Sequence, residues 1–199
     1  MLNKNKFVIA KLCAKEVGNT LNTIRVTPTE TAVTDGHLLV VVKGDEQETE
    51  DFPKVSGIQP ETDFIPFTLD KEVALSVAKS VKKSKIPILQ NIMIGANENG
   101  KYMVTTNLEQ TNIVPVKDNS GSFPDYSKVI PSEESTKFSI KFDLNKLVPL
   151  LSTLKDISNT YSDGKWAKFS FTDNNKPLRI DLKTEEEQEV IAVIMPGKL

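Results

Sequence analysis

The chain is short of the residue types that build disulfides and metal centres. It has one cysteine, Cys13, and one histidine, His37, among 199 residues. A lone cysteine cannot close an internal disulfide, and one cysteine with one histidine cannot complete a zinc site. His37 has no serine or cysteine partner at a spacing that indicates nucleophilic catalysis. We therefore expect no metal, no cofactor and no enzymatic activity.

Long apolar runs and a large excess of charge are also missing. No apolar segment approaches the roughly 20 residues of a membrane span, and the first residues lack the small-residue cleavage site of a secretion signal. The 25 Lys and Arg residues nearly balance 27 Asp and Glu, which leaves a net charge of −2. This balance excludes a uniformly basic coat protein for nucleic acid, although a local basic face remains open. We expect a soluble, cytoplasmic protein without membrane contact.

The composition is otherwise that of a folded protein. Apolar residues make up 38% and charged residues 26%, and a chain of this length can bury one large core or two smaller ones. Short apolar segments bounded by turn residues predict mostly strands. The expected strands are residues 7–12, 22–27, 37–42, 64–68, 91–96, 101–106, 113–117, 165–172, 178–183 and 190–195.

Two segments show the 3.6-residue spacing of an amphipathic helix. In residues 70–85 the apolar stripe consists of Val73, Ala74, Val77, Ala78 and Val81. The opposite arc carries lysines, which are Lys71, Lys79, Lys82 and Lys85, with Lys83 beside them. In residues 145–157 the stripe consists of Leu147, Leu150, Leu151 and Leu154.

The order of the expected elements repeats along the chain. Strand, helix and three strands occur twice, and residues 67–71 are echoed by residues 142–146. The first 65 residues look like the same strand set with its helix missing or reduced to residues 14–18. We predict an α+β fold of antiparallel sheets with two amphipathic helices on one side. The predicted divisions are a domain at 1–117, a linker at 118–136 and a C-terminal unit at 137–199.

Three separated segments then narrow the interpretation. Residues 34–39 read TDGHLL, residues 123–131 read FPDYSKVIP, and residues 194–199 read IMPGKL. Together, and in this order, they resemble the bacterial DNA polymerase III β subunit, the sliding clamp. That family has a Thr-Asp-Gly-His-Arg-Leu turn, a Phe-Pro-Asp-Tyr linker and a Met-Pro-hydrophobic-Arg-Leu tail. Leu38 stands where the family has arginine and Gly197 where it has a larger apolar residue, and the chain looks like a shortened, clamp-like form.

The resemblance implies a binding pocket for the short hydrophobic motifs of DNA polymerase, clamp-loader and repair proteins. In the family, the three segments converge between two domains to form it. The positions carried over are Thr34, Gly36, His37, Leu38, Leu39, Pro124, Lys128, Val129, Val193, Ile194, Met195, Pro196, Lys198 and Leu199. The competing interpretation of the tail is a last strand that packs on the core.

The resemblance also gives the lysine arc a possible partner. Clamp helices line a central hole and face DNA, so Lys71, Lys79, Lys82, Lys83 and Lys85 would contact duplex phosphates without sequence preference. An ordinary solvent-facing helix explains the same lysines equally simply. The leading hypothesis is a non-enzymatic processivity or recruitment factor, which would need homo-oligomers to close a ring. The alternatives are a decoy or regulator that competes for clamp partners without encircling DNA, and an enzyme on a clamp-like scaffold.

Overall fold

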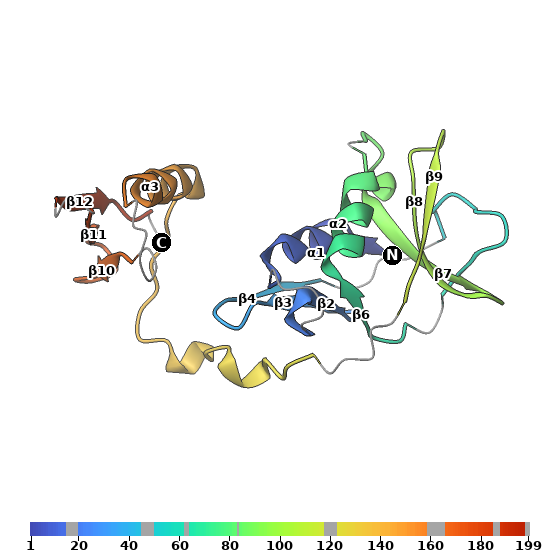
Figure 1. Cartoon of the computed structure of the whole chain (residues 1–199), viewed down its shortest axis with the longest axis horizontal. Helices are drawn as coiled ribbons and strands as arrows, with labels where there is room; N and C mark the ends of the chain where they lie inside the picture. The colour runs from blue at the N-terminus through green and yellow to red at the C-terminus, as the bar shows by residue number, and fades with distance from the viewer. Residues whose placement is uncertain are drawn as a thin grey trace. The chain divides into compact units, whose positions relative to one another are not determined.

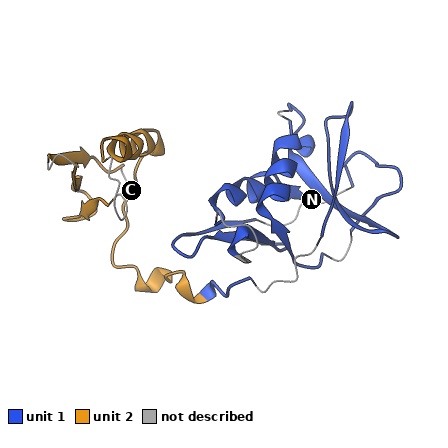
Figure 2. Ribbon diagram, in the orientation of Figure 1, with its two compact units in different colours: residues 1–127 blue, residues 128–199 orange. Residues whose placement is uncertain are grey.

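The computed structural model describes residues 1–14, 20–44, 50–61, 64–82, 84–117, 123–158, 166–184 and 188–197. The chain divides into two compact units, Met1–Ser127 and Lys128–Leu199 (Figure 2). The hydrophobic clusters of the described residues each lie within one unit. No helix among the described residues is long and apolar enough to cross a membrane.

Unit 1 contains two antiparallel sheets. The first has the strand order β4-β3-β2-β6, and the second has the order β1-β7-β8-β9 with β5 paired to β7 (Figure 1). The strands of the first sheet are β2 (Thr23–Val26), β3 (Glu30–Thr34), β4 (Leu39–Lys43) and β6 (Phe67–Asp70). Those of the second are β1 (Leu2–Asn3), β5 (Gln59–Pro60), β7 (Asn91–Asn97), β8 (Gly100–Thr106) and β9 (Thr111–Pro115).

Helices fill the space between these sheets. They are α1 (Asn5–Val8), the 3₁₀ turn η1 (Ile9–Leu12) and α2 (Lys71–Ser80). The prediction of a strand at residues 7–12 is wrong, because this segment is helical. The β-branched Val8 and Ile9 favoured a strand locally, whereas Phe7 and Ala10 are spaced for one helical face and both are fully buried. The first half of unit 1 therefore has its helix, a few residues before the position predicted for it.

The second helix is shorter than predicted. α2 ends at Ser80, and Val81 is extended and buried, so the helix stops five residues before the predicted end at residue 85. Strand β3 was not predicted, because the turn signal at Thr27–Glu30 hid the strand that follows it; the Thr27 amide donates to the Glu30 carbonyl at 2.9 Å.

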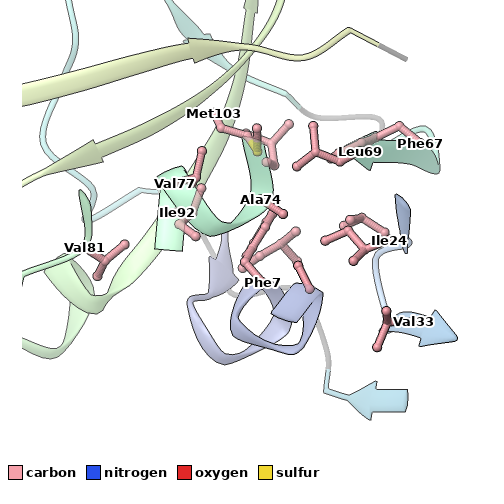
Figure 3. Packing of buried hydrophobic residues seen from close by; sticks show 14 of the residues in the cluster. Phe7, Ile24, Val33, Phe67, Leu69, Ala74, Val77, Val81, Ile92 and Met103 are labelled. Atoms are coloured by element: carbon pink, nitrogen blue, oxygen red, sulfur yellow. The ribbon is translucent and has the colours of Figure 1, made fainter. Parts of the chain in front are cut away.

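The two halves of unit 1 exchange strands. β1 precedes α1 but pairs with β7, which belongs to the half that contains α2. β6 precedes α2 but pairs with β2, the first strand after α1 and η1. Apart from the short β5, each sheet thus consists of three strands from one half and a leading strand from the other. The larger hydrophobic cluster of unit 1 combines residues of both halves, among them Phe7 and Ile24 from the first and Ala74 from the second (Figure 3).

The described residues of unit 2 form one α-helix and one sheet. The helix is α3 (Leu144–Ile157), and the sheet β10-β11-β12 is formed by Lys168–Ser170, Leu178–Lys183 and Glu189–Ile194. Alternate strand residues, among them Ile180 and Leu182, pack against Leu150 and Leu154 of α3. With these two units, the predicted class of α+β with antiparallel sheets is confirmed.

The start of α3 shows that residues 142–146 are not the structural counterpart of residues 67–71, as the sequence repeat suggested. Asp143 is the N-cap of α3 and Asp70 is the N-cap of α2. Residues 140–143 are therefore the counterpart of β6, two residues earlier than the echo of 67–71 in 142–146 implied. Burial agrees with this offset, because Leu69 is 1% exposed whereas its echo Leu144 is 68% exposed.

Candidate peptide-binding and nucleic-acid surfaces

The turn between β3 and β4 is built by side chains that bond their own backbone. The Thr34 hydroxyl donates to the Leu38 carbonyl at 2.6 Å and accepts from the Gly36 amide at 3.1 Å. The Asp35 carboxylate accepts from the His37 and Leu38 amides, each at 2.9 Å. These amide hydrogen bonds, that of His37 first, hold the pKa of Asp35 below its usual value.

The geometry of this turn also requires a glycine. Gly36 has φ +94°, in the left-handed region that other residues rarely adopt. The result is a rigid loop that exposes His37 and leaves Leu38 at 38% exposure, with Leu39 half-buried at the start of β4. The five positions carried over from the first segment are thus presented on one hairpin.

The start of the linker packs on the same sheet. Phe123 is buried, and its ring lies edge-on to that of Tyr126 with centroids 5.9 Å apart. The Tyr126 hydroxyl donates to the Glu30 carboxylate at the beginning of β3. Burial and this hydrogen bond raise the pKa of Tyr126 to about 12. The start of the linker is therefore anchored to unit 1 through Phe123 and Tyr126.

Strand register places the turn and the linker on one face. Val33 points into the core, so Glu30, Ala32 and Thr34 point to the opposite face, away from α1 and α2 (Figure 1). Ala32 is nevertheless fully buried, which is consistent with the linker covering it. Glu30 and Thr34 are four residues apart on β3, about 13 Å along a strand. The start of the linker therefore packs on the strand that leads into the turn, and its contact at Glu30 lies about 13 Å from Thr34 along β3.

The remaining linker and tail positions are mostly exposed. Pro124, Lys128 and Val129 are exposed, and Val129 lies in the short 3₁₀ turn Ser127–Val129. In unit 2, Val193 is 59% and Met195 65% exposed, whereas Ile194 is buried in the core of that unit. Pro196 is half-buried. Lys198 and Leu199 lie outside the described residues.

The tail has features of both sequence interpretations. Ile194 ends β12 and packs on the core, as expected for a last strand. Beyond it, the Gly197 amide donates to the Lys141 carbonyl at 2.8 Å, which holds the tail against the segment before α3. Met195 remains exposed at this point and is the side chain of the tail best placed to meet a partner.

The predicted lysine arc does not form a single helical face. Lys71 is half-buried, and its ammonium donates to the Cys13 carbonyl at 3.3 Å, so it has a structural role. Lys79 is exposed on the last turn of α2. Lys82 and Lys85 are exposed beyond the helix, and Lys83 lies outside the described residues.

Sequence reasoning missed three contributors to these surfaces. Tyr126 and Glu30 form the anchor of the linker, and only the long-range pairing of the fold reveals them as partners. Lys11 is exposed on η1, which packs against α2, and it was overlooked because its segment was interpreted as a strand. Within the described ranges, no cluster of three or more His, Cys, Asp or Glu side chains could hold a metal ion.

Comparison with known proteins gives a clear result at the level of structure only. No protein-family model matches the chain, and no curated protein sequence matches it. The DNA polymerase sliding clamp from Bacillus subtilis superposes with a TM-score of 0.67 at 16% identity, over 99% of this chain and 48% of the clamp.

Two further clamps give the same picture. The DNA polymerase III subunit beta from Pseudomonas aeruginosa, solved bound to griselimycin, gives a TM-score of 0.68 at 20% identity, over 98% of this chain and 48% of its own. The beta sliding clamp from C. crescentus, solved with polyethylene glycol in a region proposed to tether a β-motif, gives 0.67 at 12% identity, over 98% and 50%.

The chain thus has the fold of bacterial DNA polymerase III β sliding clamps and spans about half their length. The resemblance noted in the three sequence segments is confirmed at the level of fold. It also explains the architecture of unit 1, in which two strand–helix–strand halves pack around one core.

Proposed function

We propose that this protein is a non-enzymatic, sliding-clamp-like processivity or recruitment factor of the cytoplasm. It would bind the short hydrophobic motif of DNA polymerase and clamp-loader type proteins, and contact duplex DNA without sequence preference. The observation that carries the proposal is that the linker is bonded through Tyr126 to Glu30 on β3, the strand that leads into the turn at residues 34–39. These segments resemble the clamp family in sequence, and the chain has the clamp fold.

The exposed side chains of the turn suit an apolar peptide. Leu38 and Leu39 are held by a turn whose backbone is already bonded, so little ordering accompanies binding. In unit 2, Met195 of the tail is an exposed, adaptable apolar side chain of the kind that recurs at peptide-binding surfaces. Val129, at 66% exposure, supplies a further apolar contact from the linker.

Peptide binding can be tested by fluorescence anisotropy with a labelled peptide bearing a Gln-x-x-Leu-x-Phe motif. Leu38→Ala should weaken binding roughly 3- to 7-fold, because binding can bury only the 38% of this residue that is exposed, which is about 0.6–1.1 kcal/mol of the ~1.5–3 kcal/mol of full burial. Ile86→Ala is the matched control, since Ile86 is 48% exposed elsewhere in unit 1. Deletion of residues 195–199 should abolish binding. Equal affinities for all these proteins would contradict the peptide site.

Binding of DNA can be tested by its dependence on salt. If Lys79, Lys82 and Lys85 each neutralise one phosphate, log K against log salt should have a slope of about −2.7. Replacing all three by glutamate should remove the binding. The matched control replaces Lys43, Lys54 and Lys117 by glutamate. These lysines are also exposed in unit 1, and their replacement changes the net charge by the same amount. Binding that is lost equally in both triple variants would leave only a general charge effect.

The decoy hypothesis keeps one specific observation in its favour. Lys71 bonds to the Cys13 carbonyl and much of the predicted arc lies beyond α2, so the basic helical surface is smaller than the sequence indicated. A decoy would bind the peptide and compete with a full-length clamp for its polymerase, but would not stay on DNA. Retention on closed circular DNA, with release when the circle is cut, separates the encircling factor from the decoy.

A further inference from the structure

Unit 2 corresponds to one half of unit 1. In unit 1, a leading strand, a helix and three strands make each half, and the two halves exchange their leading strands to complete both sheets. Unit 2 has a leading segment at residues 138–143, the helix α3 and the three strands β10-β11-β12. A second half is not present among its described residues.

A comparison of α2 with α3 shows how much burial a second half provides. By their N-caps, Ala74 and Val77 of α2 correspond to Leu147 and Leu150 of α3. Ala74 and Val77 are fully buried between two sheets, whereas Leu147 and Leu150 are only half-buried on one sheet. The core of unit 2 is therefore covered on one side and open on the other.

The sheet is open at the corresponding edge. β10 is the counterpart of β2, which pairs with the exchanged strand β6 in unit 1. Among the described residues, β10 pairs only with β11. A hollow of about 470 Å³ opens between α3 and β10, lined by Leu151, Leu154, Lys155, Ser158, Trp166, Ala167, Phe169 and Leu182.

The leading segment has the pattern of a strand without a sheet. Phe138, Ile140 and Phe142 alternate with polar residues at the two-residue period of a strand, and residues 140–143 are the counterpart of β6. They pair with no strand among the described residues of unit 2, although the Lys141 carbonyl accepts one hydrogen bond from the Gly197 amide in the tail, and the ring of Phe138 lies 6.2 Å from that of Phe171. Within the described part of unit 2, the other edge of residues 140–143 has no strand beside it.

We propose that unit 2 pairs with unit 2 of a second copy of this chain. Residues 140–143 of each copy add antiparallel to β10 of the other, and the two α3 helices pack between the two completed four-stranded sheets. The arrangement is that of unit 1, made from two chains by a two-fold axis. It is independent of peptide and DNA binding, because it follows from the topology of the units.

The exposed area matches a stable dimer. The large apolar side chains beside the open edge and on the adjoining flank of α3 are Leu144, Val148, Trp166, Phe169 and Phe171, which are 68%, 56%, 82%, 44% and 46% exposed. Together they expose on the order of 600 Å². A standard interface buries about 800 Å² per partner, of which more than half is apolar. An identical half-unit supplies the same apolar face and the missing strand together.

Sedimentation equilibrium of the full chain tests the pairing. The wild type should form a dimer in a concentration-dependent way, and Val148→Glu should raise the dissociation constant roughly 100-fold or more, because the two-fold interface buries two new charges. Thr153→Glu is the matched control, since Thr153 is exposed on the opposite arc of α3 and should leave the dimer intact. A strict monomer at every concentration, or a dimer that is indifferent to Val148→Glu, overturns the proposal.

Two local measurements test the strand exchange itself. Trp166 is the only tryptophan, and its emission should shift to shorter wavelength on dimerisation. Amide hydrogen exchange of residues 140–143 and 168–170 should slow in the dimer and be fast in Val148→Glu. A dimer in which these amides exchange as fast as in the monomeric variant, or in which Trp166 stays in water, contradicts the exchange of strands.

Discussion

Replacing Gly36 tests whether backbone conformation builds the candidate peptide turn. At φ +94° an L-residue is strained by ~1–2 kcal/mol, while Gly→Ala also restricts the unfolded chain and returns ~0.4–1 kcal/mol. An added Cβ would meet the Leu21 Cδ1 atom at 3.6 Å, an ordinary contact, so packing adds no penalty. We therefore expect Gly36→Ala to destabilise unit 1 by about 1 kcal/mol, and to lower Tm by ~3–5 °C.

Asparagine provides the discriminating control. It is larger than alanine but adopts left-handed conformations several-fold more readily than most residues, so Gly36→Asn should cost less than Gly36→Ala. Thermal unfolding followed by far-UV circular dichroism gives the comparison, and Trp166 fluorescence in unit 2 should remain unchanged. A larger loss for asparagine than for alanine would show that space, not backbone conformation, limits this position.

Three other changes probe unit 1. The Thr31 hydroxyl is buried without a hydrogen-bond partner among the described atoms, so Thr31→Val should raise the unfolding free energy by ~1 kcal/mol in urea denaturation. Tyr126→Phe should lower it by ~1 kcal/mol. Because the folded pKa of Tyr126, about 12, exceeds the usual 10, this stabilisation is full below pH 10 and is lost as pH rises through 12. An ultraviolet titration of the variant should lack the tyrosine ionisation near pH 12. Burial raises the pKa of Cys13 from 9.0 to about 11, so alkylation at pH 8 should be at least ~100-fold slower than in urea.

The sequence predicted most accurately those strands and helices in which buried residues recur at a regular spacing. Residues 178–183 form β11 with the predicted limits, and α3 begins one residue before the predicted helix. In β11, Leu178, Ile180 and Leu182 are buried and alternate with exposed or half-buried residues, which is the pattern that period-2 reasoning detects.

Local preference failed where tertiary packing decided the structure. Residues 7–12 contain β-branched side chains, yet the space between two sheets selects a helix that buries Phe7 and Ala10. α2 stops at Ser80 because Val81 turns into the core, which a 3.6-residue stripe cannot distinguish from a further helical turn. The exchange of β1 and β6 between halves is non-local and has no sequence period.

At the candidate site, too, some features were predictable from the sequence and others depended on tertiary structure. The family resemblance located the hairpin and the linker, and a Thr-Asp-Gly turn favours a glycine with positive φ. The bond between Tyr126 and Glu30 joins positions 96 residues apart and could not be inferred from either neighbourhood. The lysines were selected as one arc, but Lys71 is bonded to a backbone carbonyl and Lys82 and Lys85 follow the helix.

The difference between the two units leads to a last prediction about stability. Unit 1 closes its core with its own two halves, whereas unit 2 has one helix on three strands, a small core that leaves much apolar surface in water. If a second copy completes unit 2, mass action should add about 1.4 kcal/mol per dimer, or about 0.7 kcal/mol per protomer, to its apparent stability for each tenfold rise in protein concentration. The urea midpoint followed by Trp166 should then rise with concentration, while hydrogen exchange of β7 and β8 in unit 1 should not change. Midpoints independent of concentration for both units would show that unit 2 is stable alone, and that its open face does not bind a second copy.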